Sequence, residues 1–287
     1  MYYGALNVLI TNPRDGKEFI KQLKKYKFTA ITGVNTLFNL IMNNPHINEV
    51  DFSALKVALG GGMAVQDVVA QRWQELTHKP LLGAYGLTET SPAVCINPMN
   101  CPAFNGTVGL PVPSTEISIR DKDGKELGFN QAGELMVRGP QVMAGYWHQE
   151  VETRKVLNND GWLHTGDMAE VNPLGYVKIV DRIKDMIIVS GFNVYPNEVE
   201  DVIAAMPGVK EVAVIGVPDE THGENVKAFI VRKDPSVTEQ DVIKYCHQHL
   251  TGYKIPHLVE FRDSLPKSNV GKVLRRQLRD DKTNPPR

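Results

Sequence analysis

The chain has 287 residues, 42% of them hydrophobic, which is enough for roughly two globular domains with cores of their own. Its 32 lysines and arginines nearly balance 33 acidic residues, so the overall charge favours neither nucleic acid nor an anionic membrane surface as a partner. The three cysteines are odd in number and lack metal-ligand spacing, which predicts a reducing, cytoplasmic environment.

The first part of the chain, residues 1–96, is predicted to form an α/β sheet. Its expected elements are an internal strand over 6–10, a helix over 17–27, a buried strand over 28–32, a strand over 56–59, a helix through Val65, Val68, Val69 and Trp73, and a strand at 81–82. Glycines at 60–62 separate the third of these strands from the helix after it. This succession is typical of a sheet with partly parallel strands.

The sequence pattern changes at about Asn97, where prolines begin to separate short segments of alternating apolar and polar residues. Strands are expected over 116–120 and 134–137. We therefore predict an all-β stretch over residues 97–183, forming a small barrel or sheet.

After Arg182 the pattern changes again. The expected elements are a helix over 197–206, strands over 211–217 and 226–232, and a helix over 238–250. They predict a compact α+β unit over residues 184–287, joined to the rest by a short hinge near Lys184. No apolar run is long enough to span a bilayer, although peripheral contact with the inner face of the membrane stays open.

The segment Tyr85-Gly86-Leu87-Thr88-Glu89 follows the last predicted strand of the first part. It places an aromatic ring, a tight turn, a hydroxyl and a carboxylate in immediate succession. A ring can cover a purine, a hydroxyl can donate to phosphate, and a carboxylate suits Mg²⁺. Taken alone, however, the segment is more often an ordinary corner between a strand and a turn.

Three later segments favour a nucleotide site over an ordinary corner. They are Gly161-Trp162-Leu163-His164-Thr165-Gly166-Asp167, Asp181-Arg182-Ile183-Lys184-Asp185, and Pro266-Lys267-Ser268-Asn269-Val270-Gly271-Lys272. With Tyr85 to Glu89, their order and spacing resemble the superfamily of acyl-CoA synthetases, luciferases and peptide-synthetase adenylation domains. Residues 160–196 are especially similar to bacterial long-chain fatty acyl-CoA synthetases. The resemblance implies part of an adenylate-forming large domain, an α/β sheet with a small β-barrel, followed by a mobile C-terminal domain.

The resemblance implies a ligase that uses ATP, Mg²⁺ and coenzyme A. A carboxylate resists attack because its leaving group would be oxide, so ATP first converts it to an acyl-adenylate, and the coenzyme A thiolate then takes the acyl group. Bringing carboxylate and triphosphate together requires positive charge. By resemblance Lys272 supplies it, Glu89 binds Mg²⁺ and Thr88 contacts phosphate.

Other positions are carried over in the same way. Asp167 and Arg182 would contact the ribose, Gly60, Gly61, Gly62, Tyr85 and Gly86 the adenosine, and Gly191 the pantetheine arm of coenzyme A, while Lys184 would be the hinge. The rival interpretations are structural: turn glycines, a turn aspartate, a surface arginine and a solvated lysine.

One family feature is absent from the sequence, namely the Ser/Thr/Gly-rich loop that ends in lysine and wraps the β- and γ-phosphates. We therefore expect a carboxy-terminal portion of a longer enzyme, with impaired catalysis. Two alternatives stay open: a non-catalytic AMP- or coenzyme A-binding fragment, and an aryl-acid ligase or luciferase-like enzyme. The expected partners are fatty acid, ATP and coenzyme A, not nucleic acid, with a homodimer left open.

Overall fold

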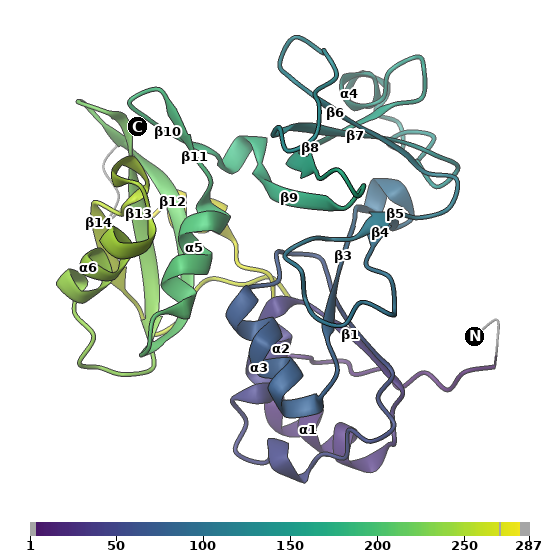
Figure 1. Cartoon of the computed structure of the whole chain (residues 1–287), viewed down its shortest axis with the longest axis vertical. Coiled ribbons are helices and arrows are strands. Elements are labelled where there is room, and N and C mark those ends of the chain that lie inside the picture. The colour runs from purple at the N-terminus through teal and green to yellow at the C-terminus, as the bar shows by residue number, and fades with distance from the viewer. Residues whose placement is uncertain (1–3, 270, 282–287) are drawn as a thin grey trace.

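The computed structural model describes residues 4–269 and 271–281, and within them the strands form three sheets (Figure 1). The first two sheets are built before residue 183, and the third lies after it. The arrangement combines an α/β part, a β-rich part and an α+β part in chain order, as the sequence predicts. The division of domains at residue 184 stays a prediction.

The first sheet has the spatial order β1-β2-β3-β4-β5. Its strands are β1 (Ala30–Gly33), β2 (Val57–Gly60), β3 (Leu81–Gly86), β4 (Ala93–Ile96) and β5 (Leu110–Pro111). The first three are parallel and the last two antiparallel, which agrees with a partly parallel sheet. The accompanying helices are α1 (Gly16–Lys25), α2 (Asn35–Met42) and α3 (Asp67–Thr77), and a short 3-10 helix, η1, spans Ile47–Glu49.

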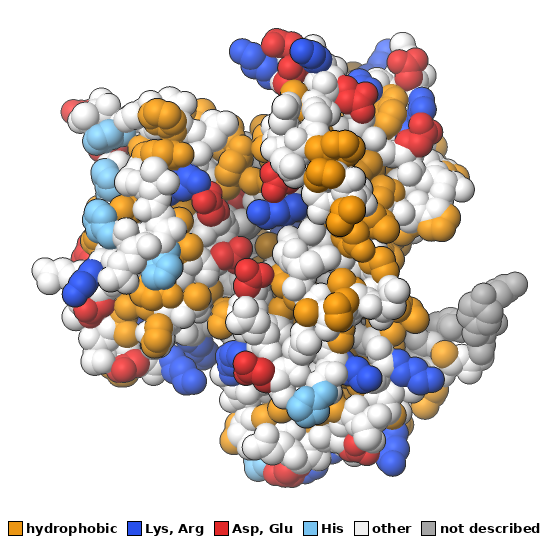
Figure 2. Space-filling view, in the orientation of Figure 1, with side chains coloured by type: hydrophobic (Ala, Val, Ile, Leu, Met, Phe, Trp, Pro, Cys, Tyr) orange, Lys and Arg blue, Asp and Glu red, His pale blue; other side chains and the backbone are white. Residues whose placement is uncertain are grey.

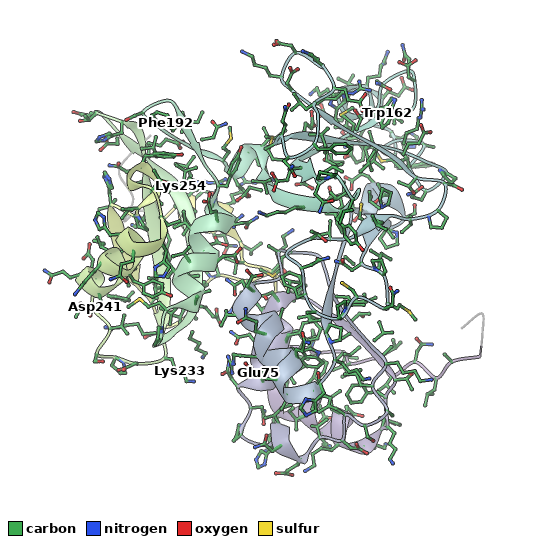
Figure 3. All side chains as sticks on the ribbon, viewed as in Figure 1. Glu75, Trp162, Phe192, Lys233, Asp241 and Lys254 are labelled. Atoms are coloured by element: carbon green, nitrogen blue, oxygen red, sulfur yellow. The ribbon has the colours of Figure 1, made fainter. Side chains whose placement is uncertain are left out.

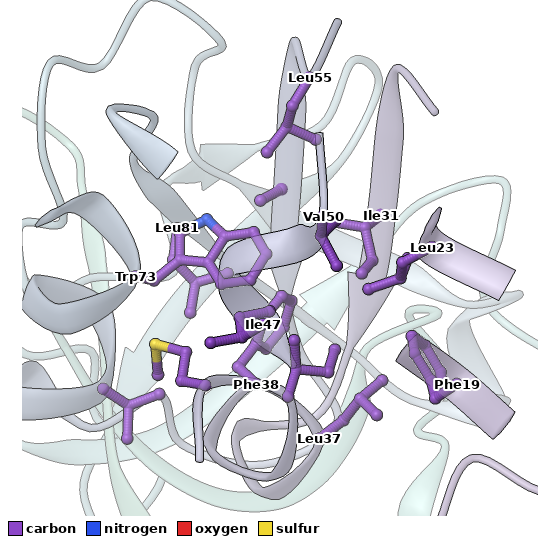
Figure 4. Packing of buried hydrophobic residues seen from close by; sticks show 14 of the residues in the cluster. Phe19, Leu23, Ile31, Leu37, Phe38, Ile47, Val50, Leu55, Trp73 and Leu81 are labelled. Carbon is purple, nitrogen blue, oxygen red and sulfur yellow. The ribbon is translucent and has the colours of Figure 1, made fainter. Parts of the chain in front are cut away.

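The core of this part gathers around Trp73, which is fully buried on α3 (Figure 4). Phe38 from α2 meets its ring edge-on, with ring centroids 4.9 Å apart, and Phe52 does so at 5.6 Å. Aromatic pairs prefer such edge-to-face contacts. The apolar spacing of α1 buries Phe19, Ile20 and Leu23 on the same side.

One prediction in this part is wrong, and another is confirmed only in part. Residues 6–10 form no strand, and Leu6 and Leu9 are 81% and 84% exposed, because no neighbouring strand among the described residues offers them backbone partners. The strand expected at 28–32 is instead β1, of which only Ile31 is buried. In the described sheet β1 is the edge strand, so a neighbouring strand pairs with it on one side only.

The second sheet is antiparallel, with the order β6-β7-β8-β9. Its strands are β6 (Glu116–Arg120), β7 (Gly133–Arg138), β8 (Leu163–Val171) and β9 (Val177–Arg182). A bridge between Gly109 and Val177 links β9 to the residue before β5. One apolar core joins the first and second sheets, with Val94 and Cys95 from β4 packed among residues of β6 to β9.

The stretch from 97 to 183 is not all-β as predicted, because it contains α4 (Glu150–Val156). None of the residues of α4 is buried. Its charged residues at positions three and four apart give a polar helix without an apolar face, and such a helix has no apolar periodicity for sequence reasoning to detect.

The third sheet has the order β11-β10-β13-β12, with β14 parallel to β13. Its strands are β10 (Ile187–Val189), β11 (Phe192–Val194), β12 (Val209–Asp219), β13 (Gly223–Arg232) and β14 (Leu258–Phe261), and its helices are α5 (Pro196–Ala205), α6 (Glu239–His249) and α7 (Arg275–Arg279). A capping box between Thr238 and Asp241 starts α6. We call residues 184–281 of this part the C-terminal unit.

The C-terminal unit contacts the first sheet through helices, since α5 packs against α3 (Figure 1). Hydrogen bonds between described residues cross this junction: Thr36 donates to the carbonyl of Gly271 at 2.8 Å, and Asn39 donates to that of Lys210 at 3.1 Å. Figure 2 shows acidic and basic side chains together where the three parts meet. Within the described residues, every helix is too short or too polar to cross a membrane.

Candidate functional site

Asp167, in the middle of β8, lies at the centre of a cluster to which strands of both of the first two sheets contribute. Its position on β8 is opposite Arg182 on β9, and the Arg182 Nε lies 3.4 Å from Asp167 Oδ1. The hydroxyl of Tyr85, from the end of β3, donates to Asp167 Oδ2 at 2.6 Å. The structure therefore brings together three predicted site residues that are up to 97 positions apart in the chain.

The electrostatics of this cluster follow from its burial. Asp167 is only 5% exposed, and this desolvation raises its pKa, while the Tyr85 hydroxyl and the positive charge of Arg182 act in the opposite direction. Burial, together with the Asp167 carboxylate, also raises the pKa of Tyr85, so its hydroxyl remains a donor. The direct bond between Tyr85 and Asp167 was not predicted, because nothing in the sequence pairs residues so far apart.

Lys272 reaches the same environment from the C-terminal unit. It lies in a tight turn in which the Ser268 Oγ accepts from the Lys272 amide at 3.1 Å and the Ser268 amide donates to the Lys272 carbonyl at 2.8 Å. Burial and the positive charge of Arg182 lower the pKa of Lys272, and Asp167 opposes this. The bond from Thr36 to Gly271 ties the turn to the start of α2.

Thr88 and Glu89 form part of η2 (Thr88–Thr90), a 3-10 helix directly after β3. Thr88 is exposed, and Glu89 Oε1 accepts a hydrogen bond from the Tyr146 hydroxyl at 2.8 Å. This bond raises the pKa of Tyr146. Sequence reasoning missed Tyr146, which is 57 positions from Glu89 and lies in a loop without a motif.

Gly86, just before η2, has a structural reason to be glycine. A Cβ there would lie 1.8 Å from the carbonyl oxygen of Pro92, which is far inside van der Waals contact. The close approach of the two backbones lets the Leu87 amide donate to the same oxygen at 2.9 Å. The glycine thus sets the corner that presents Thr88 and Glu89.

Gly60 is the last residue of β2 and pairs with Gly83 of β3, and Gly61 and Gly62 follow it. A Cβ on Gly60 would lie 2.5 Å from Val65, and one on Gly61 would lie 3.2 Å from the Ala84 carbonyl oxygen. Gly62 has a positive φ of 75°. Packing and backbone conformation therefore already require small residues here, and an additional role beside a nucleotide stays a prediction.

Gly191 is not brought to the Asp167 cluster. It lies exposed in the turn between β10 and β11, with a φ of 83° and no atom within 4 Å of the place of a Cβ. Its neighbour Phe192 marks the end of the C-terminal unit that lies away from α3 (Figure 3). Lys184 is exposed within η3 (Ile183–Asp185), directly after β9. The predicted contact with coenzyme A is thus separate from the Lys272 site in this arrangement.

The described ranges hold no group of three His, Cys, Asp or Glu residues suited to a metal ion. Mg²⁺ in nucleotide sites, however, is commonly held by one or two carboxylates together with phosphates and water. The carboxylate of Glu89 fits that smaller requirement. Its Oε1 accepts the hydrogen bond from Tyr146.

Comparison with known proteins gives two matching families along the chain. The family described as AMP-binding enzyme matches residues 1–147, and the AMP-binding enzyme C-terminal domain matches residues 198–272. A long-chain-fatty-acid–CoA ligase from Escherichia coli O157:H7 is 58% identical over 97% of this chain and 49% of its own length. The chain thus spans about half the length of the curated relatives it matches.

Solved structures also match. The anthranilate CoA ligase AuaEII in complex with anthranoyl-AMP has a TM-score of 0.89 and 28% identity, covering 96% of this chain and 54% of its own. ATP-bound MatB from Rhodopseudomonas palustris has a TM-score of 0.84 and 33% identity, with 93% and 53% covered, whereas apo MatB, covering the same shares at 34% identity, has a TM-score of 0.70. These likenesses confirm the predicted fold class.

Proposed function

This chain belongs to the AMP-binding enzyme family, and from that premise we propose that the protein ligates a long-chain fatty acid to coenzyme A through an acyl-adenylate. In the first step the fatty acid carboxylate attacks the α-phosphate of ATP and pyrophosphate leaves. In the second, the thiolate of coenzyme A attacks the acyl carbon and AMP leaves. The observation that carries the proposal is the convergence of Lys272 with Tyr85, Asp167 and Arg182.

The charges around Asp167 suit a nucleotide. Three cations act on its carboxylate, namely Arg182, Lys272 and Lys184, so this spot is locally positive although the chain as a whole has a net charge of −1. An anion entering here meets an excess of positive charge in a partly desolvated place, where electrostatic attraction is stronger than in water. Phosphate and carboxylate groups would both gain from this.

Each residue then has a role that its position allows. Lys272 bridges the reacting carboxylate and the α-phosphate, which offsets their repulsion. Asp167 accepts from the ribose hydroxyls while Tyr85 and Arg182 hold its carboxylate in place. Thr88 donates to phosphate from its exposed place in η2. Gly60, Gly61 and Gly62 leave room for the flat adenine beside β3.

Mg²⁺ would be held by Glu89, and when bound it would neutralise phosphate charge. Tyr146 would restrain the Glu89 side chain through its hydrogen bond to Oε1, which leaves Oε2 without a hydrogen-bond partner among the described residues and able to act as a ligand. The exposed Gly191 contacts the pantetheine arm only after the C-terminal unit reorients about Lys184. The predicted peripheral membrane contact, homodimer and cytoplasmic location stay predictions.

The proposal is tested by joining this chain to the amino-terminal half of the 58% identical E. coli relative and measuring pyrophosphate release with Mg²⁺ and ATP. Palmitate, octanoate and benzoate are offered in turn, followed by coenzyme A. We expect palmitate to give the highest kcat/KM and to yield palmitoyl-CoA. A preference for benzoate would favour the aryl-acid alternative. The reason to test that alternative is the structural likeness to AuaEII, which is an anthranilate CoA ligase.

The chain alone is tested by calorimetry with AMP and with a non-hydrolysable acyl-adenylate analogue. Binding that depends on Asp167, without pyrophosphate release, would support a fragment that keeps its adenosine contacts but lacks the phosphate loop. Absence of both binding and activity in the joined protein would overturn the proposal.

A further inference from the structure

The amino-terminal end of helix α5 is capped by a residue that lies far outside the helix. Its own N-cap residue, Tyr195, provides no side-chain hydrogen bond. Instead, the Asn197 amide donates to Asp181 Oδ2 at 2.8 Å. A carboxylate here satisfies an amide of the first helical turn and interacts favourably with the helix dipole. Asp181 belongs to β9, so the cap joins two parts of the molecule.

The Asn197 side chain adds two more bonds at the same place. Its Nδ2 donates to the carbonyl of Val180 at 3.1 Å, and its Oδ1 accepts from Arg275 Nη2 at 2.8 Å. Arg275 also brings Nη1 to 3.5 Å from Asp181 Oδ1. Since Arg275 follows Lys272 by only three positions, this cluster is linked directly to the turn that carries Lys272.

The cluster is deeply buried. Asp181 is 1% exposed, and the Arg275 side chain is 17% exposed. Burial raises the pKa of Asp181, whereas Arg275 and the two amides of Asn197 and Arg182 oppose this. A buried carboxylate needs such partners, so separating them is strongly unfavourable unless water can enter.

These contacts all cross the predicted hinge. Val180 and Asp181 precede Lys184, while Asn197 and Arg275 follow it. A rotation of the C-terminal unit about Lys184 must therefore break every one of them. Asp185 offers a contrast: its partners Arg279 and Arg275 lie on its own side of Lys184 and would move with it.

We propose that Asp181, Asn197 and Arg275 form a latch that holds the C-terminal unit in the orientation that brings Lys272 to Asp167. Asp181 is then a positioning residue for adenylation, and release of the latch permits the second orientation. That catalytic meaning rests on the proposed function; the latch itself rests on the contacts. We define the latch by these three residues.

The latch is tested by measuring a distance that needs no substrate. Spin labels are placed on Glu75→Cys of α3 and Lys233→Cys after β13, both exposed and on either side of the junction (Figure 3), in a Cys101→Ser background. Cys95 and Cys246 are buried. We expect one short distance in the parent. Asp181→Ala should add a longer population and lower the ratio of closed to open molecules by roughly tenfold, as expected for loss of a charged hydrogen bond.

The matched control is Asp185→Ala, which removes the same side chain at the same 3.5 Å from Arg275 but crosses no hinge. It should lower the melting temperature without changing the distance. An unchanged distance in Asp181→Ala, or an equal change in both variants, would overturn the latch. If Asp181→Ala does not fold, Asn197→Ala removes the two other hydrogen bonds of the latch, to Val180 and Arg275, and leaves the amide bond to Asp181 in place; an unchanged distance in that variant also overturns the latch.

A second measurement separates the latch from the function. In the joined protein, Asp181→Ala should lower kcat for pyrophosphate release by roughly tenfold, in line with the same lost bond, and leave thioester formation from supplied acyl-adenylate within about twofold. Absent activity in the parent would contradict the proposed function while leaving the distance result intact. Equal losses in both steps would show a merely structural role for Asp181.

Discussion

At the scale of single residues, Asp201 shows how the junction concentrates negative charge. It lies on α5, where burial and then Asp67, the first residue of α3, raise its pKa to about 7. The neighbouring Glu200 and Asp181 act in the same direction, and Lys178 of β9 opposes them. Sequence reasoning did not single out Asp201, because its two acidic neighbours from other elements become close only in the folded chain.

Asp201→Asn should therefore stabilise the protein at alkaline pH. In the unfolded chain the Asp201 carboxyl ionises near pH 4, and in the folded chain near pH 7, so its contribution to stability is lost as pH rises through this window. One pKa unit corresponds to about 1.4 kcal/mol, and solvent screening reduces the effect. We therefore expect Asp201→Asn to raise the free energy of unfolding at pH 8 by about 1–3 kcal/mol. Urea unfolding at pH 4 and pH 8 measures it; an equal effect at both values would contradict the assigned pKa.

Lys272 is the residue on which the proposed first step depends. Lys272→Ala in the joined protein should reduce acyl-adenylate formation by at least about a hundredfold, since loss of one transition-state charge partner commonly has that effect. Thioester formation from supplied acyl-adenylate should change little, because the thiolate attacks an uncharged acyl carbon in that step and Lys272 has no carboxylate and triphosphate to bridge. Stopped-flow measurement of each half-reaction decides this. The turn bonds of Lys272 use its backbone, so the fold should survive.

At the scale of elements, glycines divide into those required by packing and those that leave space. Gly86 ends β3 against the Pro92 backbone, whereas Gly191 in the β10–β11 turn faces open surroundings. Both appear in the sequence only as glycines beside a motif. The difference between them depends on what lies across from each, and the chain supplies that only when β3 has paired with β4.

Gly86→Ala and Gly191→Ala should consequently differ in stability. The first must push the β3 and β4 backbones apart and should lower the free energy of unfolding by more than about 3 kcal/mol. The second meets no atom and should show only the strain of a positive φ, about 1–2 kcal/mol. Thermal unfolding of the two variants under one buffer makes the comparison. Similar losses would mean that the close approach at Gly86 relaxes easily.

At the scale of the whole molecule, the proposed function gives the C-terminal unit two tasks, and the observed orientation suits one of them. Lys272 already lies in the environment of Asp167, while Gly191 lies exposed elsewhere. The chain also resembles ATP-bound MatB, at a TM-score of 0.84, more than apo MatB, at 0.70. Both observations agree with an orientation suited to the first half-reaction, which the latch would hold.

Lys184→Pro should trap this orientation in the joined protein. Proline fixes φ and removes a backbone donor, and so restricts the few dihedral angles on which a hinge depends. Adenylation should stay near the parental rate, whereas thioester formation should fall at least about tenfold if domain reorientation limits it. Normal rates in both half-reactions would place the pivot elsewhere. The exposed side chain of Lys184 makes a packing defect a weak explanation.

The sequence by itself determined the family resemblance, the order of the three parts and most elements with a clear apolar period. Helix α5 and strands β6, β12 and β13 lie where their spacing predicts, because amphipathic patterns are properties of the local chain. Elements without such a pattern were missed or misplaced. The polar helix α4 was missing from the prediction, and residues 6–10 have the apolar run of a strand but no partner strand in the described part of the chain.

Only the tertiary structure decided which residues meet. The bonds from Tyr85 to Asp167, from Tyr146 to Glu89 and from Asn197 to Asp181 join elements that no local pattern connects. A motif records which chemical groups a site can use, but distance and burial set their charge and their freedom to move. Those depend on how sheets and helices pack, and for this reason the latch and the raised pKa of Asp201 could be found only in the folded chain.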